Sequence, residues 1–598
     1  LSCALLGITL LHAATGYAAI SQTPLSLTVG VPPNMALTLD DSGSMRWAFA
    51  PDNVNGVHAT RRAKSSDFNP LYFNPAISYR APIVFNTAGV EQQLSTSYSA
   101  ALLNGYKSNY GDIDLRSNYR FTWSYDLLST QATGYGYSNT SNRLGENPSA
   151  DFPSCYVTSL NVGQTKTCTS LGKTITITRG ADTGGRNSTR TCTAVTDGLP
   201  SGNCSYNSDN TRYTGSWLQA GVPAYYYTYD PTLANNCTTG NDNCYQLNFV
   251  SSDQQQNFAN WYSFYRNRAL ATISAAALAF YDLSPSVRLT WQGLGNCTTF
   301  SGSDTDNCYN NSLKEYSPTH KGQLYAWLQN IKFNQSTPLP AALKRAGEFY
   351  TTGTPWQKNP NGTGNTTNNT YACRASYHIL MTDGQWNDTT TKPSNFRHDA
   401  DTFNLPDGRA YSARRPFYDS QAETLADLAM HYWATDLNPN LNNDVPAYIP
   451  YKSGDTTTDY WDARNDPATW QHMTNFMMGL GLTQSLNNAN VPWAGSTFTG
   501  RGYRDLVAGT VNWPPASSGS ANNIYDLWHA AINSRGEFFS VDSPEAMVQA
   551  FVDILSRISD RKSTAARPAI NSGQVSVDEN NNGTVKTVSY QTSYASDD

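Results

Sequence analysis

Two kinds of hydrophobic pattern alternate from about residue 250 onward, and one run of the first kind lies near the start of the chain. Short, continuous apolar runs predict buried strands of a parallel sheet, at residues 37–39, 287–292, 376–382, 473–481 and 536–541. Apolar residues at helical spacing predict helices within residues 252–283 and at residues 322–332, 336–348 (after a turn), 421–437, 523–534 and 543–558. Because strands alternate with helices, we expect an α/β fold with a doubly wound, mostly parallel sheet.

The stretch from residue 51 to residue 250 breaks this alternation. It is rich in Gly, Asn, Ser, Thr, Tyr and Cys, and alternating runs such as residues 173–178 predict half-exposed strands. We predict a large, irregular, disulfide-rich β insertion at residues 51–250, inside a domain built from residues 20–50 and 251–560. Polar residues and short β-like runs return after that domain, so residues 561–598 are expected to begin a further, truncated β domain.

The first 19 residues have the pattern of a secretory signal peptide whose own start is missing. They are apolar from Ala4 to Leu11 and close with small residues. This segment is too short for a convincing membrane span, and no other segment is long and apolar enough. The chain has 40 Lys and Arg against 46 Asp and Glu and no long basic run. We therefore expect an exported protein with no nucleic-acid partner.

The cysteines also indicate export into an oxidising compartment. Cys3 lies in the predicted signal peptide, and Cys373 has no close neighbour, so it is either a buried thiol or a sign of different pairing. The other eight lie close together in pairs, for which local disulfides are the simplest of many possible connectivities. The pairs are Cys155 with Cys168, Cys192 with Cys204, Cys237 with Cys244, and Cys297 with Cys308.

The most informative motif is Asp40-x-Ser42-x-Ser44, which directly follows the first predicted strand. A carboxylate and two hydroxyls at alternate positions of a tight turn can face one point. Such hard, weakly charged oxygen ligands suit Mg²⁺, Ca²⁺ or Mn²⁺ rather than zinc. An ordinary strand-to-helix turn with an aspartate cap has the same residues, so the motif alone leaves that alternative open.

The motif resembles the first loop of the metal-ion-dependent adhesion site (MIDAS) of von Willebrand factor A (vWA) domains. In that family a second loop supplies a threonine before a helix, and a third supplies an aspartate after a strand. Thr337 and Asp383 match these places in the right chain order. The resemblance thus implies a vWA-like, Rossmann-like fold and a metal site of Asp40, Ser42, Ser44, Thr337 and Asp383. One coordination position would stay open for a partner's carboxylate. Asp41 is expected to cap the turn rather than bind metal.

Further motifs resemble one family, the PilY-type tip-associated adhesins of bacterial type IV pili. The first of them is Met381-Thr-Asp-Gly-Gln-Trp-Asn387, and the others lie at residues 69–76, 425–437, 466–472 and 526–536. The family's usual layout is a signal peptide, a vWA domain broken by an insertion, and a C-terminal β-propeller. The resemblance implies export through the periplasm of a Gram-negative bacterium and display at the pilus tip with minor pilins. There the protein would support pilus assembly, twitching motility, adhesion and surface sensing.

The expected function is therefore partner binding through a divalent cation, with minor pilins and a host or abiotic receptor that exposes a carboxylate as partners. The alternative is a non-adhesive scaffold that docks to minor pilins and whose metal site is structural or vestigial. The sequence has no His-Glu-x-x-His, no Gly-x-Ser-x-Gly and no phosphate-binding loop. We do not expect an enzyme.

Overall fold

Most, but not all, residues of the chain are described by the computed structural model. They are residues 31–50, 60–119, 121, 152–184, 190–196, 203–207, 211–216, 223–302, 307–361, 369–388, 392–564, 573–577 and 585–589. The predicted signal peptide lies outside them.

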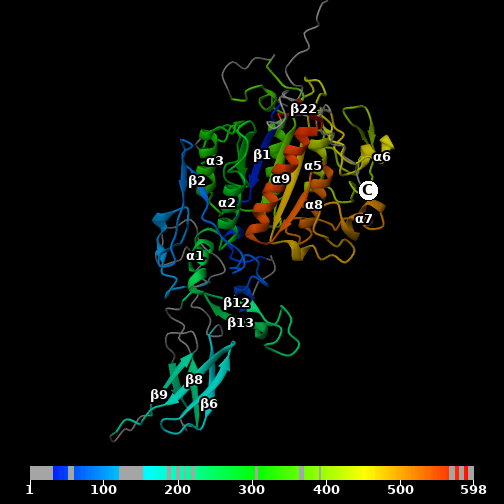
Figure 1. Cartoon of the computed structure of the whole chain (residues 1–598). Helices are drawn as coiled ribbons and strands as arrows, with labels where there is room; N and C mark the ends of the chain where they lie inside the picture. Colours follow the sequence, from blue (N-terminus) through cyan, green and yellow to red (C-terminus); the bar gives the residue numbers. More distant parts are fainter. Residues whose placement is uncertain are drawn as a thin grey trace, which may run out of the picture.

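A six-stranded sheet forms the centre of the fold (Figure 1). All of its neighbouring strands pair in parallel, except that the short edge strand β15 runs antiparallel to β14. In spatial order the strands are β15 (Lys314–Glu315), β14 (Arg288–Gly293), β1 (Asn34–Leu39), β16 (Ser376–Thr382), β19 (Met473–Leu480) and β20 (Phe538–Val541). Numbered by their order in the chain, they lie 3-2-1-4-5-6 across the sheet. The prediction of an α/β fold with parallel strands is confirmed.

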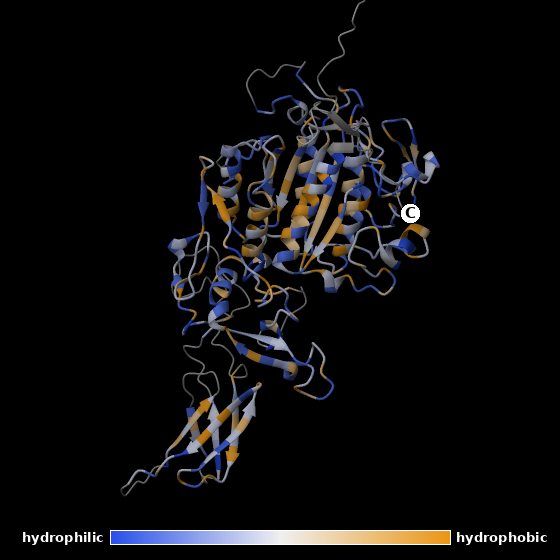
Figure 2. Cartoon of the chain, in the orientation of Figure 1, coloured by the Kyte–Doolittle hydropathy of each residue, from blue (hydrophilic) through white to orange (hydrophobic). Residues whose placement is uncertain are grey.

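Two apolar cores cover the two faces of this sheet, because successive side chains of a strand point to opposite faces. Met35, Leu37 and Leu39 of β1 belong to one core, and Ala36 belongs to the other. The first core is closed by helices α1 (Gln255–Phe264), α2 (Arg268–Ala279), α3 (Pro318–Asn330) and α9 (Pro544–Thr564). The second is closed by helices α4 (Leu339–Tyr350), α5 (Leu425–Ala434) and α8 (Asn523–Asn533). Figure 2 shows the strands as an apolar layer between these helices.

Helix boundaries differ from the predicted ones where a capping residue decides them. The predicted helical stretch 252–283 is two helices, because the Asn267 side chain caps α2 by accepting the Leu270 N–H. Helix α3 begins at Pro318 rather than at residue 322, because Ser317 caps it and proline suits the first turn. Helix α9 continues past residue 558 to Thr564.

Smaller elements surround this sheet. Two helices, α6 (Thr456–Trp461) and α7 (Gly500–Ala508), lie outside the central layers, and α9 is followed by the paired strands β21 (Gly573–Val577) and β22 (Val585–Ser589). Two-stranded antiparallel pairs are formed by β2 (Ile83–Phe85) with β3 (Glu91–Gln93), β4 (Ala101–Leu102) with β5 (Asp112–Ile113), β12 (Tyr225–Tyr229) with β13 (Tyr245–Phe249), and β17 (Phe403–Asn404) with β18 (Ala410–Tyr411).

The predicted insertion is divided between two cores. Its first part packs onto the sheet domain, where Tyr72 and Phe73 lie against Trp261 of α1. A second part has a small core of its own and extends away from the central sheet (Figure 1). We call it the distal unit. One of its sheets contains β10 (Asn203–Tyr206), β11 (Arg212–Ser216) and β6 (Ser154–Thr158), and the other contains β7 (Thr165–Ser170), β8 (Lys173–Arg179) and β9 (Cys192–Thr196).

Disulfides form between all four predicted cysteine pairs. Cys155–Cys168 joins β6 to β7 and Cys192–Cys204 joins β9 to β10, so both link one sheet of the distal unit to the other. Cys373 is a free, partly buried thiol.

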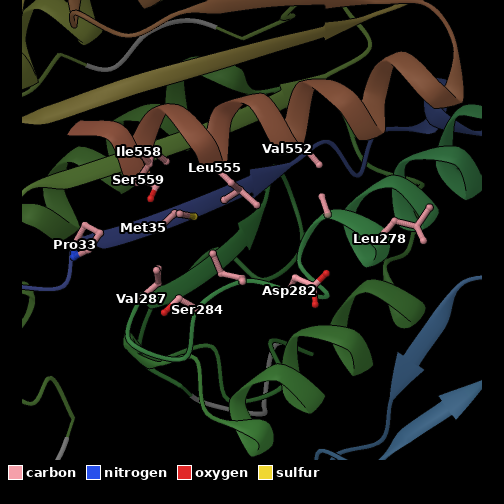
Figure 3. A pocket seen from close by; sticks show the side chains of 12 residues that line it. Pro33, Met35, Leu278, Asp282, Ser284, Val287, Val552, Leu555, Ile558 and Ser559 are labelled. Carbon is pink, nitrogen blue, oxygen red and sulfur yellow. The ribbon is translucent and has the colours of Figure 1, made fainter. Parts of the chain in front are cut away.

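A cavity of about 420 Å³ lies at the end of the sheet where the parallel strands begin (Figure 3). It is lined by Pro33 and Met35 at the start of β1, by residues at the end of α2, and by Leu555 and Ile558 of α9. Across the part of the chain that the structure describes, no helix is long and apolar enough to cross a membrane.

Candidate metal centre

Asp40 directly follows β1, and its side chain is fully buried between two loops. One carboxylate oxygen, Oδ1, accepts the N–H of Ser42 at 2.7 Å. The other, Oδ2, accepts the hydroxyl of Thr382 at 2.7 Å and the N–H of Asp383 at 3.3 Å. Asp40 therefore ties the loop after β1 to the end of the neighbouring parallel strand β16.

The two serines of the motif connect to Asp383 through a chain of oxygen atoms. The hydroxyls of Ser42 and Ser44 lie 3.0 Å apart, and the Ser44 hydroxyl donates to Oδ1 of Asp383 at 2.9 Å. Four of the five predicted ligands, Asp40, Ser42, Ser44 and Asp383, are thus brought together. They meet beyond the carboxyl ends of β1 and β16, where the sheet order reverses and where open α/β sheets place their ligands.

Thr337, the fifth predicted ligand, lies in a loop that is hydrogen-bonded both to the loop after β1 and to the loop after β16. Gly43 donates its N–H to Gln335 O at 3.0 Å, and Gln335 donates to Asp41 O at 3.1 Å. The Thr337 N–H donates to Oδ1 of Asn387 at 3.1 Å, and the Asn387 N–H donates to Thr337 O at 3.2 Å. The structure brings this loop to the site without a direct hydrogen bond between Thr337 and the other four predicted ligands.

Asp41 points away from the site, as expected for a cap. Its carboxylate accepts the backbone N–H groups of Leu294, Gly295 and Asn296 at 2.7–3.1 Å. It thereby holds the turn that follows β14. Burial raises the pKa of Asp41, and these N–H donors counteract part of that rise.

Arg268 is the residue of this site that the sequence did not reveal. Its Nη1 lies 2.7 Å from Oδ2 of Asp383, and both side chains are fully buried. It is the first residue of α2, far from Asp383 in the chain, so no local motif joins the two. One signal in the sequence could have indicated Arg268. It is a charged residue at the start of an otherwise apolar, alanine-rich helix, and a charge that is buried with such a helix requires a partner.

The electrostatics of the site favour an added positive charge. Burial raises the pKa of Asp40 to about 7, and the nearby charge of Asp383 adds to the rise. Hydrogen bonds from Ser42 and Thr382 only partly counteract it. Asp40, Asp383 and Arg268 together leave one net negative charge when both carboxylates are ionised.

The residues present fit a hard divalent cation. The carboxylates and the hydroxyls of Ser42 and Ser44 are oxygen donors of the kind that Mg²⁺, Ca²⁺ and Mn²⁺ prefer. Ser44 is only partly buried, and Asn387 at the rim is exposed, so the cluster reaches the surface. Arg268 occupies Oδ2 of Asp383, while Oδ1 faces the serine hydroxyls.

A second group of potential ligands is formed by His398, Asp399 and Asp427. The His398 Nδ1 lies 3.5 Å from Asp399 Oδ1 and 3.4 Å from Asp427 Oδ1. However, the Ala400 N–H already donates to this nitrogen at 2.8 Å, and the Asp399 N–H donates to Asp427 at 3.3 Å. We therefore interpret the group as packing between this loop and α5 rather than as a metal site.

Fold and site together define a mixed α/β protein with an oxygen-rich, partly open site at the point where the strand order reverses. No protein-family model matches the chain. The chain is 41% identical over 612 residues to the "Type IV pilus biogenesis factor PilY1" of Pseudomonas aeruginosa strain PAO1, a match that covers 100% of the chain and 44% of that protein. It is 39% identical over 610 residues to the same factor of strain PAK, with the same coverage. The predicted resemblance to the PilY-type family is confirmed, and the chain is a homologue of the part of these proteins that it spans.

The chain spans less than half the length of these curated relatives. Among solved structures, the pilus adhesin SpaC from Lactobacillus rhamnosus GG matches 51% of this chain and 28% of its own, at 11% identity and a TM-score of 0.18. That likeness is too weak to support an argument.

Proposed function

We propose that the chain is the vWA-like part of a type IV pilus biogenesis factor, and that it binds its partners through a divalent cation at the Asp40 site. The observation that carries this proposal is the cluster of Asp40, Ser42, Ser44 and Asp383 beyond the carboxyl ends of two adjacent parallel strands. The strand order 3-2-1-4-5-6 supports a Rossmann-like, vWA-like domain. The names of the relatives support the pilus role.

In this function the protein's own residues position the ion and leave room for the partner. Asp40 and Asp383 would neutralise the cation, the hydroxyls of Ser42, Ser44 and Thr337 would ligate it, and the bound ion would attract a carboxylate. Minor pilins at the pilus tip and a surface receptor with an exposed carboxylate are the proposed partners. The proposed location is the pilus tip, reached through the periplasm, and the proposed role is binding rather than catalysis.

One observation favours a second function, a scaffold that docks to minor pilins without using a metal. The buried pair of Arg268 and Asp383 already supplies a cation at the site. The hydrogen bonds of Asp40, Thr337 and Asn387 already hold the three loops together. In the scaffold function these bonds alone would shape the docking surface.

Calorimetric titration of Mg²⁺, Ca²⁺ and Mn²⁺ into the chelator-treated chain separates the two functions. The metal-binding function predicts saturable binding that is lost in Asp40→Asn and in the double variant Ser42→Ala with Ser44→Ala, which keeps every carboxylate. The control is Asp455→Asn, which removes an exposed helix-capping carboxylate of α6 and should bind like the wild type. If a folded wild type binds none of the three ions, the metal function is wrong and the scaffold remains.

A further inference from the structure

Arg268 is held at the site by several contacts that fix its guanidinium group. Besides the 2.7 Å contact of Nη1 with Asp383, its Nε donates to Phe49 O at 2.8 Å. The guanidinium lies over the rings of Trp47 and Phe49, 5.1 and 5.5 Å from their centres. Its backbone N–H donates to Trp47 O at 3.0 Å. Because its surroundings over-determine its position, Arg268 cannot move away from Asp383 without breaking these contacts.

The guanidinium and a bound cation would share one carboxylate. Arg268 contacts Oδ2 of Asp383, whereas Ser44 contacts Oδ1, the oxygen that faces the remaining predicted ligands. Like charges this close repel strongly in a buried site, where little water screens them. The Arg268 charge also acts on Asp542, because burial raises the pKa of that carboxyl group and the Arg268 charge lowers it.

We propose that Arg268 is a built-in cation that competes with a divalent ion for Asp383 and thereby lowers the affinity of this site for metal. The inference rests on the proposed metal-binding function. In the metal-free protein Arg268 stabilises the Asp383 carboxylate, which otherwise lies buried beside Asp40. When an ion binds, the carboxylate is shared between the two cations. The affinity for metal is therefore set by a residue that does not itself coordinate the ion.

The test compares Mn²⁺ binding by the wild type, Arg268→Gln and Arg268→Lys, measured by calorimetry and by the electron paramagnetic resonance signal of free Mn²⁺. Removing the charge in Arg268→Gln should tighten binding at least tenfold, which corresponds to about 1.4 kcal/mol. Arg268→Lys keeps the charge and should stay within about threefold of the wild type. Arg268→Gln should also gain more thermal stability from Mn²⁺ than the wild type gains, because its metal-free form leaves Asp383 unpaired.

The matched control is Arg374→Gln. Arg374 lies just before β16 and is also fully buried, but it donates to the carbonyl oxygens of Pro355 and Gln357. Its replacement should leave Mn²⁺ affinity unchanged. If Arg268→Gln does not fold, the nitrogen resonance of the Arg268 Nε in the wild type, assigned by its absence from Arg268→Lys, provides a second measurement. It should shift when Mg²⁺ is added, and a resonance that does not move while Mg²⁺ binds overturns the proposal.

The outcomes separate this inference from the proposed function. If the wild type binds Mn²⁺ and Arg268→Gln binds it equally or more weakly, the competition is wrong and the metal function stands. If only Arg268→Gln binds, the competition is supported and Arg268 blocks the site in the wild type. If neither folded protein binds, both proposals fail.

Discussion

Ionising Asp40 costs the folded protein free energy, because Asp40 is a fully buried carboxylate beside a second one, Asp383. Its pKa is raised from 3.8 to about 7, first by burial and then by the charge of Asp383. A folded-state pKa above the unfolded value means that the folded protein retains a proton that the unfolded chain releases. The ionised form of Asp40 therefore destabilises the metal-free protein as the pH rises from about 4 through 7.

We therefore expect the Asp40→Asn variant, in the presence of a chelator, to gain stability relative to the wild type as the pH rises. The difference in unfolding free energy, variant minus wild type, should rise between pH 4 and pH 8 by up to about 4 kcal/mol. At pH 4, where Asp40 is protonated in the folded protein, the variant should be the less stable protein, because the amide NH2 group cannot accept a hydrogen bond from Ser42 or Thr382 as a carboxyl oxygen can. Denaturant unfolding at several pH values measures the difference.

Asp114→Asn serves as the control for this prediction. Asp114 is partly exposed to solvent, and hydrogen bonds from Arg116 lower its pKa. Its variant should show no comparable rise between pH 4 and pH 8. A flat difference for Asp40→Asn as well would mean that neither burial nor the charge of Asp383 raises the pKa of Asp40 in the folded protein.

At the scale of residues, the meeting of Asp40, Ser42, Ser44 and Asp383 could be predicted from the sequence. The contact of Arg268 with Asp383 could not. Asp40, Ser42 and Ser44 alternate after a strand, and Asp383 follows another parallel strand, so the geometry of a parallel sheet places all four at one edge. Arg268 lies 115 positions from Asp383 in the chain. Its partner follows only from the way α2 packs on the sheet, which no local pattern specifies.

At the scale of elements, the start of α5 is fixed by a carboxylate from another helix. Asp526 of α8 accepts the N–H groups of Leu425 and Ala426, both at 3.0 Å, and the indole N–H of Trp386 at 3.1 Å. A negative charge at a helix N-terminus is stabilising, and here the same charge anchors the loop that carries Asp383. Asp526 therefore links α8, α5 and the candidate site.

Replacing Asp526 with Ala should lower the unfolding free energy by about 3 kcal/mol or more, because three buried N–H donors lose their acceptor. The comparison is Asp455→Ala, which removes the exposed cap of α6, where Asp455 accepts from Thr457 and Thr458. That change should cost about 1 kcal/mol. Urea unfolding of both variants measures the two losses, and equal losses would show that Asp526 acts only as an ordinary cap.

Strands and helices could be predicted because their hydrophobic periods differ, whereas their ends depend on single side chains. The strand at Met473–Leu480 ends one residue before the predicted position, where Gly481 adopts a φ of +73°. Helix α5 is shorter than predicted, because Thr424 and Asp427 form a capping box inside the expected helical range. Several neighbouring positions are equally apolar, and the hydrogen bonds of single side chains decide which of them begins or ends the element. The hydrophobic period does not report these hydrogen bonds.

At the scale of the whole molecule, the distal unit depends on its disulfides. Its core consists of Val157, Leu160, Ile175, Ile177, Ala194 and Tyr213, which is small for an independent unit. Gly215 allows the two sheets to approach, since a Cβ there would lie 2.6 Å from a methyl carbon of Ile175. Cys155–Cys168 and Cys192–Cys204 supply the cross-links between these sheets.

Replacing all four of these cysteines with Ser should unfold the distal unit and leave the sheet domain intact. Limited proteolysis should then cut within residues 152–216, while the main calorimetric unfolding transition stays at its wild-type temperature. By contrast, Cys297→Ser with Cys308→Ser, beside the turn held by Asp41, should lower the stability of the sheet domain by about 2–3 kcal/mol. A main transition that falls equally in both variants would mean that the distal unit and the sheet domain unfold together.

The α/β class could be predicted from composition and period. The way in which residues 51–250 divide between two cores could not, because the aromatic residues of both parts occur in similar sequence surroundings. Tyr72 and Phe73 complete the core of the sheet domain, whereas Tyr213 belongs to the distal core. Long-range packing decides which of the two cores an aromatic residue joins, and the spacing of residues in the sequence does not indicate it.

The cavity where the parallel strands begin shows where the two ends of the sheet domain lie, and their position has a mechanical consequence. Pro33, just before β1, and Ile558, near the end of α9, line the same space, so both ends of the sheet domain lie together (Figure 3). The Asp40 site lies at the opposite end of β1, which is paired in parallel with β14 on one side and β16 on the other. Tension between a partner held at Asp40 and the chain at Pro33 would run along β1. A partner held at the site would also pull on Asp383 at the end of β16, so part of the load would pass from β16 to β1. The evenly spaced hydrogen bonds of that ladder would resist this part of the load in shear, all at once, rather than open one after another.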